Sequence, residues 1–313
     1  MKNAFFGIVL LALLCVVPGF LIAQSQPVDD LTGRLREVPL DHEPVADLAQ
    51  RHDLSTLSVL AVNWGLDMFE PQTRDRILLP TAHLIPDAKR EGVVVNLAEY
   101  RLYYFKDGQV AMTAPVAHGE EGHNTPLGET TILRKKKDPV WTPTASTRDD
   151  FPGLPSVVPP GPDNPLGGYA FYLNWPTYLI HGAIDPYALG RRLTRGCVRL
   201  YEADIERLFN LVPVGTSVTV VDQPVKLGWH ENELFLEAQP SFEQFEELRL
   251  TQAFTTSGGE TLDSWITAKA GGRVADLDWG TVRTTLARRN GVPTQITSPR
   301  THPVSIIDNN LGF

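Results

Sequence analysis

The sequence is poor in cysteine and has no excess of basic residues. It holds only two cysteines, and its 28 lysines and arginines stand against 37 aspartates and glutamates, a formal net charge of −9. A chain of that charge is a poor match for the phosphates of nucleic acid, so we expect no nucleic-acid partner. Its 25 glycines and 25 prolines indicate many turns and favour a loop-rich β protein over a helical bundle.

Long apolar runs are also rare, with one exception at the N-terminus. Lys2 precedes an apolar stretch over residues 4–17, which Pro18 ends, and Ala23 offers a small residue for cleavage. This order is typical of a secretory signal peptide over residues 1–23. The alternative is an uncleaved membrane anchor, because the stretch approaches the ~20 apolar residues that a span needs. We therefore expect an exported protein that meets a membrane only through this segment, and only if it stays uncleaved.

Export changes how the two cysteines are interpreted. Cys15 lies within the signal segment, so the mature chain would keep Cys197 alone and could form no internal disulfide. A lone cysteine is often a small buried hydrophobe, and that is the alternative to a reactive thiol. The residues around Cys197 decide between the two.

A polar segment and a small α/β segment precede the β-rich centre of the chain. Residues 24–40 are polar, with Asp and Pro, and we expect a linker there. Residues 41–81 show two short helical patterns followed by an apolar run at 77–80. This order resembles a degenerate LysM module, a small peptidoglycan-binding fold. The alternative is a helical hairpin that only packs against the next domain.

From residue 91 to residue 222 the pattern predicts a mainly β domain. Strand patterns occur at residues 92–96, 101–105, 110–116, 130–134, 169–173, 177–180 and 218–221. Asp107-Gly108 marks a hairpin turn, and residues 202–211 have helical spacing. Residues 223–313 form a mixed extension with one hairpin pattern and three short helical patterns.

Three other features of this region invite interpretation. Residues 139–168 are a long loop rich in Pro and Gly, and a loop of that length is more often functional than idle, although a stapled surface loop is the alternative. The basic run at residues 134–137 is typical of a solvated strand edge. His118 and His123 are poor metal ligands, because they lie in a flexible glycine-rich loop without cysteine. We expect neither a metal nor a cofactor.

The chemistry is concentrated in residues 178–200. His181-Gly182 ends an apolar strand, and Gly196-Cys197 follows with the cysteine sixteen residues after the histidine. A histidine can take the proton of a thiol, whose ordinary pKa of ~8.5 leaves little thiolate at neutral pH. Gly196 permits a tight turn whose N–H groups could bind a developing oxyanion, and nearby arginines would stabilise negative charge. Such a site suits acyl transfer from an amide.

This run resembles the signature of the L,D-transpeptidase (YkuD) catalytic-domain family, which is His-Gly-(Thr or Ala) followed by (Ser or Thr)-x-Gly-Cys-(Val or Ile)-Arg-(Leu or Met). It is most similar to the Gram-negative, ErfK/YbiS/YcfS/YnhG-like branch. Supporting stretches occur in the family's order at residues 92–105, 124–129, 140–144, 159–167 and 213–222. The departures are Ala183, Thr194 and Arg195, where Thr, Ser and His are usual. They leave every catalytic group in place and put the choice of acceptor in doubt more than the activity.

The resemblance implies a YkuD-like β-sandwich or barrel with one or two helices. Cys197 would be the nucleophile and His181 the general base and acid, with the Gly182 carbonyl orienting the imidazole. In the tight turn at Gly196, the backbone N–H groups of Arg195, Gly196 and Cys197 would bind the oxyanion. Arg199 and Arg192 would serve as carboxylate-binding or structural forks. The other residues that would contact substrate, as walls of the cleft, are Tyr169, Asn164 and Trp141.

The implied reaction cleaves the amide between meso-diaminopimelate and the terminal D-Ala of a tetrapeptide stem, and passes the acyl group to an amine. The partners would be peptidoglycan stem peptides in the periplasm, with another stem, a wall-anchored lipoprotein or an outer-membrane protein as acceptor. A carbapenem would acylate Cys197 by the same analogy. Two alternatives remain: a hydrolase on the same fold, with water as acceptor, and a non-catalytic peptidoglycan-binding protein. The sixteen-residue spacing argues against a sortase-like enzyme.

Overall fold

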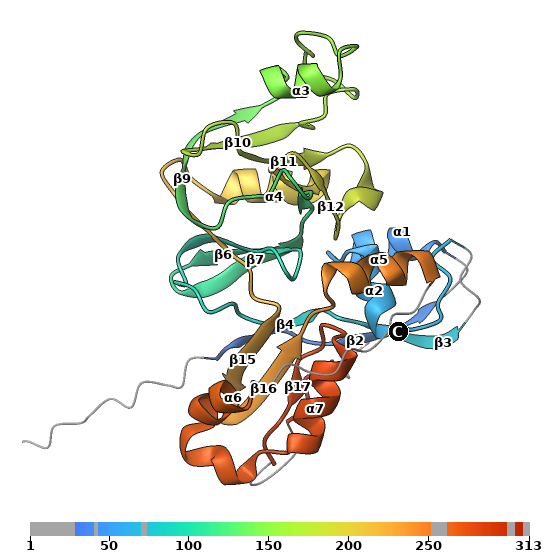
Figure 1. Ribbon diagram of the computed structural model, residues 1–313, viewed down its shortest axis with the longest axis vertical. Coiled ribbons are helices and arrows are strands. Elements are labelled where there is room, and N and C mark those ends of the chain that lie inside the picture. The colour runs from blue at the N-terminus through green and yellow to red at the C-terminus, as the bar shows by residue number, and fades with distance from the viewer. Residues whose placement is uncertain (1–28, 41–42, 70–73, 252–261, 299–303, 309–313) are drawn as a thin grey trace, which may run out of the picture.

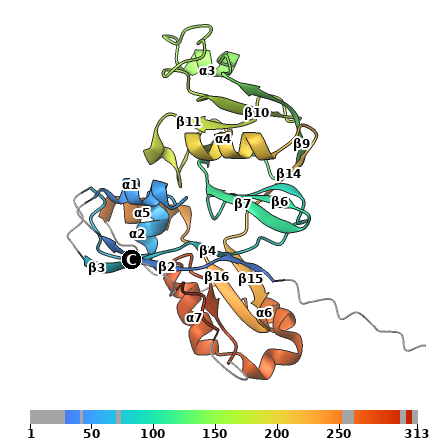
Figure 2. The ribbon, with the colours of Figure 1, turned by 180° about the vertical axis from the view of Figure 1, so that it is seen from behind.

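The computed structural model describes residues 29–40, 43–69, 74–251, 262–298 and 304–308. A β-rich body is flanked by an N-terminal α/β unit and by a C-terminal unit (Figures 1 and 2). The expected signal peptide at residues 1–23 lies outside the described residues. In the part of the chain that is described, every helix is too short or too polar to cross a bilayer.

The expected mainly β architecture is confirmed by one eight-stranded sheet. In spatial order its strands are β13 (Val198–Tyr201), β11 (Leu179–Ala183), β10 (Tyr169–Leu173), β9 (Gly128–Lys137), β14 (Ser217–Val221), β5 (Gly92–Asn96), β6 (Arg101–Lys106) and β7 (Gln109–Pro115). The sheet curls until its two ends meet, because Ala117, just after β7, and Arg199 on β13 donate to each other's carbonyls at 3.0 and 2.9 Å. The result is a nearly closed barrel.

Helix α4 (Glu202–Leu211) begins directly after β13 and fills the barrel-like sheet from one side (Figure 1). Its buried Ile205 and Leu208 join the main core with Phe171 of β10 and Leu200 of β13. The helix therefore ties the strand that follows the cysteine to the middle of the sheet.

The basic run at residues 134–137 is a solvated strand edge, as expected. It occupies the second half of β9, where only β10 pairs with the strand, because β14 pairs with residues 128–131. Arg134, Lys136 and Lys137 are exposed. Lys135 Nζ donates to the carbonyls of Phe209 and Val212 at 2.6 and 2.9 Å, which caps the C-terminal end of α4.

Residues 31–40, expected as part of a linker, instead form two strands. Strand β1 (Leu31–Gly33) pairs with β4 (Ala82–Leu84), and β2 (Arg36–Leu40) pairs with β3 (Arg74–Leu79), both antiparallel. β2 is mostly half-buried and contains Pro39, which it tolerates because the register shifts between Val38 and Leu40. This polar, proline-containing composition concealed the strand in the sequence.

Two helices lie between β2 and β3, α1 (Val45–Arg51) and α2 (Thr56–Val62), so the unit has strand–helix–helix–strand order. A third helix, α5 (Phe242–Thr251), joins them from the C-terminal extension. Its Phe245 and Leu248 are buried in the same core as α1 and α2. The expected C-terminal extension is therefore shared between two units.

The rest of the extension has the expected mixed character. It consists of the sheet β15 (Val225–His230), β16 (Glu233–Ala238) and β17 (Thr294–Gln295), with the helices α6 (Asp263–Ala270) and α7 (Trp279–Arg288) and the 3₁₀ turn η2 (Gly271–Asp276). Both α-helices pack their apolar faces on this sheet.

A buried lysine joins these units to the barrel. The Nζ atom of Lys226 on β15 lies 2.7 Å from Glu99 Oε2 and 2.9 Å from Glu237 Oε1, and it donates to the carbonyl of Leu84 at 2.6 Å. These partners come from the β5–β6 turn, β16 and β4. His83, Glu99 and Glu237 have the spacing of a cation site, and the Lys226 ammonium supplies the positive charge there.

Replacing this lysine should cost much of the protein's stability. Lys226→Met would leave two buried carboxylates without their cation, a loss of about 3–5 kcal/mol in the free energy of unfolding. The urea midpoint, followed by circular dichroism, measures it. Lys136→Met, at an exposed position on β9, is the matched control and should stay within about 0.5 kcal/mol of wild type. Equal midpoints for the two variants would contradict a role for the buried ammonium.

Candidate active site

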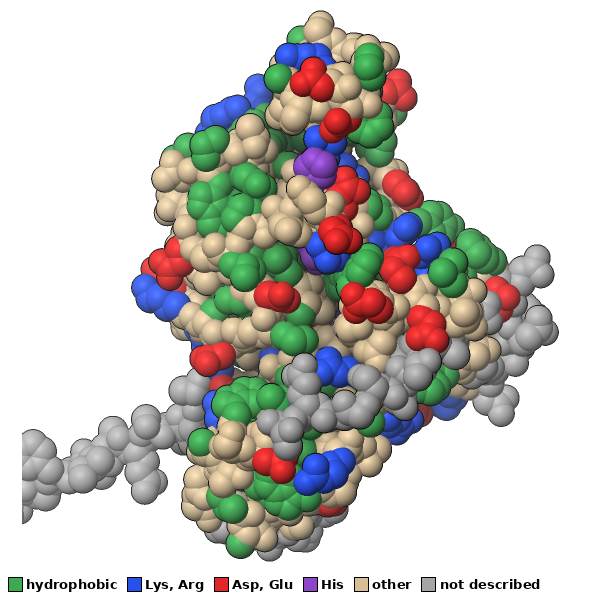
Figure 3. Space-filling view, viewed as in Figure 1, with side chains coloured by type: hydrophobic (Ala, Val, Ile, Leu, Met, Phe, Trp, Pro, Cys, Tyr) green, Lys and Arg blue, Asp and Glu red, His purple; other side chains and the backbone are tan. Residues whose placement is uncertain are grey.

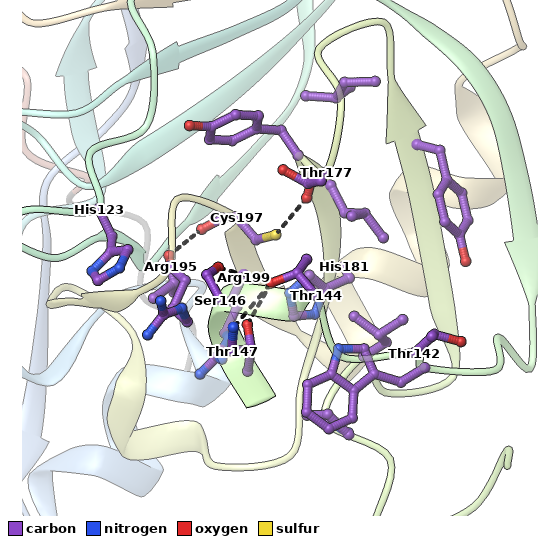
Figure 4. Close-up of a pocket in the computed structure, with 18 of the residues that line it drawn as sticks. His123, Thr142, Thr144, Ser146, Thr147, Thr177, His181, Arg195, Cys197 and Arg199 are labelled. Atoms are coloured by element: carbon purple, nitrogen blue, oxygen red, sulfur yellow. Dashed lines mark hydrogen bonds between the residues drawn. The ribbon is translucent and has the colours of Figure 1, made fainter. Parts of the chain in front are cut away.

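Two adjacent parallel strands bring His181 and Cys197 together. In β11 and β13, Ile180 pairs with Val198 and His181 with Arg199, so Cys197 stands just before the strand beside the histidine. Parallel strands need a long crossover. It is supplied by the turn η1 (Pro186–Ala188) and strand β12 (Arg192–Thr194), which accounts for the sixteen-residue spacing. Figure 4 shows both side chains at one cavity.

The loop before Cys197 is held in one conformation by its neighbours. Gly196 has φ of +98°, and a Cβ there would lie 2.5 Å from the Tyr178 ring, so only glycine fits. Its carbonyl accepts a hydrogen bond from Thr125 Oγ1 at 2.9 Å. The hydroxyl of Thr194 donates to the Cys197 carbonyl at 2.6 Å.

The expected oxyanion donor Gly196 is already engaged. Its N–H donates to Thr194 Oγ1 at 3.1 Å. By contrast, the N–H groups of Arg195 and Cys197 donate to no other residue in the part of the chain that the structure describes. The donors available for an oxyanion are therefore those two.

His181 is buried and its tautomer is set by the backbone. Its Nδ1 donates to the Gly182 carbonyl at 2.7 Å, which leaves the Nε2 lone pair as the acceptor of the neutral ring. Burial, assisted by the charge of Arg199, lowers the pKa of His181 to about 3, while the backbones of Gly182 and Leu166 act in the opposite direction. The imidazole is thus neutral at physiological pH.

The thiol of Cys197 is also kept in its neutral form. Burial raises the pKa of Cys197, against the smaller effects of the Leu179 backbone and Arg199. Its Sγ lies 3.7 Å from the Thr177 carbonyl, a weak contact in which the thiol is the donor (Figure 4). The resting pair is therefore a thiol and a neutral base, and the thiolate forms only when the proton is transferred.

A cavity of about 590 Å³ lies in front of Cys197. The 139–168 loop forms much of its wall, as the sequence suggested for a functional loop. This loop contributes Val140, Trp141, Thr142, Thr144, Ser146, Thr147, Pro165 and Leu166. Helix α3 (Ala145–Asp150) lies in the outer part of the loop (Figure 1). Below it, histidine, basic and acidic side chains gather on the surface (Figure 3).

The base of this loop is fixed, but its tip has little support. Trp141 and Val158 donate to each other's carbonyls at 2.9 and 2.8 Å, which closes the base. Between them, residues 142–157 contribute to none of the described core clusters. One ion pair reaches from α3 to the nucleophile loop, between Asp150 Oδ2 and Arg195 Nη2 at 2.6 Å.

Of the five substrate-contact candidates, Arg199 and Trp141 line the cavity. Arg199 is mostly buried, and its Nε atom has no hydrogen-bond partner among the described residues. A carboxylate entering the cavity would satisfy that donor. Arg195 also lines the cavity, through its side chain.

Asn164 supports the loop instead of facing the cavity. Its side chain is fully buried, its Nδ2 donates to the carbonyls of Pro139 and Val158 at 2.8 and 3.2 Å, and its Oδ1 accepts from the Leu166 N–H at 2.9 Å. The sequence placed it correctly in the turn, but all its hydrogen bonds go to the backbone.

Tyr169 and Arg192 also lie outside the cavity. Tyr169 is on the face of β10 that meets α4, where its hydroxyl donates to Glu206 at 2.5 Å. Arg192 donates to Gly119 O and Asn124 Oδ1 at 3.1 and 2.8 Å, so it braces the glycine-rich loop behind the cysteine.

Several lining residues were missed in the sequence. Tyr172 lies on the opposite face of β10 from Tyr169 and forms part of the wall, as the alternation of a strand requires. Arg134 stacks over its ring at 3.3 Å from the centroid. The run of Thr and Ser hydroxyls at residues 142–147 is the sequence feature that could have indicated the other missed wall residues. His123 lines the cavity, whereas His118 is buried and donates to Leu97 O at 3.1 Å.

Comparison with known proteins agrees with this geometry. Residues 90–220 match the L,D-transpeptidase catalytic domain, YkuD. Over 300 residues the chain is 34% identical to the probable L,D-transpeptidase ErfK/SrfK of Salmonella typhimurium, covering 91% of this chain and 95% of that one. Over 190 residues it is 40% identical to the probable L,D-transpeptidase YbiS of Escherichia coli, covering 59% and 62%. The catalytic domain of an E. faecium L,D-transpeptidase, solved by NMR, aligns with 43% of this chain and 99% of its own, at 25% identity and a TM-score of 0.35.

The chain therefore belongs to the L,D-transpeptidase family. Its relatives within that family include the ErfK/SrfK, YbiS and YcfS proteins, which support the Gram-negative branch that the motifs resembled.

The neutral resting pair makes a prediction about pH. Alkylation of Cys197 by iodoacetamide in the free enzyme should rise about tenfold per pH unit between pH 6 and 8, because only the small thiolate fraction reacts. Peptide mass mapping measures it and separates Cys197 from Cys15. N-acetylcysteine, followed in parallel, controls for the reagent. A rate that stays flat between pH 5 and 8 would instead reveal a preformed thiolate–imidazolium pair.

Proposed function

We propose that this protein is a peptidoglycan L,D-transpeptidase that works through an acyl-enzyme on Cys197. The observation that carries the proposal is the meeting of Cys197 and His181 at one cavity, with the Nδ1 of the histidine bonded to the Gly182 carbonyl. Family membership gives the reaction class, since the named relatives are probable L,D-transpeptidases.

In the first half-reaction, Cys197 Sγ attacks the amide carbonyl between meso-diaminopimelate and D-Ala while His181 Nε2 takes the thiol proton. The N–H groups of Arg195 and Cys197 bind the oxyanion of the tetrahedral intermediate. When the intermediate collapses, the C–N bond breaks, the D-Ala amine takes the proton from His181, and a thioester remains on Cys197.

In the second half-reaction an amine attacks the thioester, and His181 takes one of its protons. Collapse expels the Cys197 thiolate, which regains that proton, and a new amide is released. Burial supports this cycle. The neutral His181 accepts a proton readily only when a negative charge develops beside it, and it returns the proton at once.

The cavity walls suit a peptide that carries carboxylates. Arg199 contributes an unpaired Nε, Arg134 and Arg195 add positive charge at the walls, and Trp141 and Tyr172 supply flat apolar surface. We assign the stem peptide to this cavity. The acyl acceptor is a second stem peptide, a wall-anchored lipoprotein or an outer-membrane protein, and water as acceptor would make the enzyme a hydrolase.

We also propose that the protein acts in the periplasm after export by its N-terminal signal segment, and that the N-terminal unit binds glycan as a LysM-like module. The strand–helix–helix–strand order of β2, α1, α2 and β3 supports the second proposal. So does Phe69, an aromatic ring 66% exposed just beyond α2.

Loss of the thiol should stop the reaction. Cys197→Ala should lower turnover of a disaccharide-tetrapeptide by a factor of about 10³ or more, because no acyl-enzyme can form. Mass spectrometry of the products measures it. In the wild type, dimers joined through two diaminopimelates indicate cross-linking, and tripeptide alone indicates hydrolysis.

The matched measurement is the intact mass of the protein after exposure to a carbapenem. The wild type should gain one adduct and Cys197→Ala none. A wild type that neither turns over substrate nor gains mass would overturn the enzyme proposal and leave a non-catalytic binder.

Binding by the N-terminal unit can be tested apart from catalysis. Cys197→Ala should still co-sediment with peptidoglycan sacculi, and adding Phe69→Ala should weaken this binding by about tenfold, the effect of losing one stacked aromatic side chain. Trp265→Ala removes another exposed ring, 42% exposed on α6, and should leave binding unchanged. If both variants bind equally, the exposed Phe69 plays no part.

A further inference from the structure

Glu202, the first residue of α4, holds its carboxyl group in an unusual place. Its Oε2 accepts a hydrogen bond from the Gly168 N–H at 3.1 Å, whereas its Oε1 is buried and has no hydrogen-bond partner among the described residues. A buried carboxylate oxygen without a partner is costly. The single hydrogen bond to Gly168 does not account for the burial of the other carboxyl oxygen.

The unpartnered oxygen lies against two glycines. A Cβ built on Gly182 would be 1.8 Å from Glu202 Oε1, and a Cβ built on Gly167 would also be 1.8 Å from it. The Cβ position of Gly167 is in turn 3.1 Å from the Gly182 Cα atom. The carboxyl group thus fills the space that the missing side chains of the two glycines leave beside their closely approaching backbones.

The backbone at or next to each of these two glycines contacts the His181 ring. The Gly182 carbonyl accepts the Nδ1 hydrogen bond of His181 at 2.7 Å. Leu166, the neighbour of Gly167, lines the cavity, and its backbone also interacts with the imidazole. Glu202 is therefore in contact with the peptide segments on two sides of the ring without touching the cavity.

From this geometry we infer that Glu202 is a positioning residue for His181, acting as a wedge that fixes the Gly182 and Gly167 backbones so that the imidazole faces Cys197. The inference rests on the proposed role of His181 as the base. It also gives a reason for glycine after the histidine, since any side chain at Gly182 would collide with the wedge.

The shape of Glu202 matters here more than its charge. Burial raises the pKa of Glu202, and the Gly168 N–H offsets this only in part, so the site does not favour the ionised form. An ordinary helix-start carboxylate would face solvent and favour the charge. Glutamine, which has the same shape without the charge, should therefore replace Glu202 well, and alanine should not.

The test compares Glu202→Gln, Glu202→Ala, Gly182→Ala and the double variant Gly182→Ala/Glu202→Ala. Glu202→Gln should stay within about threefold of wild-type kcat, and Glu202→Ala should lose about tenfold in kcat with little change in KM. Gly182→Ala should lose about 100-fold, the cost of misplacing a catalytic group by about 1 Å. The double variant should regain at least about tenfold over Gly182→Ala, because its methyl group enters the vacated space.

A pH profile separates positioning from general stability. Without the wedge, water reaches His181 and its pKa rises from the depressed value, so the acid limb of kcat/KM in Glu202→Ala should move toward neutrality by about one pH unit. Glu206→Ala, one turn along α4 at an exposed site, should change neither kcat nor the profile. Melting temperatures of all variants are recorded beside the kinetics.

Failure of this inference differs from failure of the proposed function. If the wild type is active and Glu202→Ala matches it, or if the double variant is no better than Gly182→Ala, Glu202 is not a wedge. If the wild type forms no product, the proposed function fails. In that case the same four variants are compared by the rate at which a carbapenem acylates Cys197. These rates should fall in the order expected above for kcat. An equal rate in all four would overturn the inference.

Discussion

The parallel pairing of β11 with β13 is the constraint on which the site depends. It sets His181 beside Arg199 and leaves Cys197 at the start of the neighbouring strand. Because the strands run the same way, the chain between them must cross over, and this crossover carries the loop that presents the thiol. The same register places Gly182 opposite Leu200, two residues before Glu202. One pairing therefore aligns Cys197, His181 and Glu202.

Burial of this pair decides its chemistry. Removing the thiol and the imidazole from water favours the uncharged form of each, which raises the pKa of Cys197 and lowers that of His181. The charge of Arg199 lowers both pKa values, since it stabilises a thiolate and disfavours an imidazolium. Cys197 and His181 therefore rest as a neutral thiol and a neutral imidazole, and a charged pair forms only when the proton moves from Sγ to the ring.

The sequence predicted what depends on local spacing and missed what depends on packing. The strands, the hairpin turn and helix α4 follow from alternation and helical spacing near their observed bounds. Tyr169 and Asn164 were placed on the right segments, but the face of a strand and the burial of a turn are tertiary properties. The sequence correctly predicted a turn at Gly196. It did not indicate that the Gly196 N–H donates to Thr194 Oγ1, because this contact depends on the folded loop.

The 139–168 loop, which lines the cavity, has a base and a tip that are held by interactions of different strength. Its base is closed by backbone pairing at Trp141 and by the buried Asn164. Its tip is tied to the body by the Asp150–Arg195 ion pair, whose side chains are 52% and 26% exposed. A pair in that setting is worth only about 0–1 kcal/mol. The tip is therefore held more weakly than the base. Because Arg195 precedes Gly196, the ion pair links the tip directly to the loop that carries Cys197.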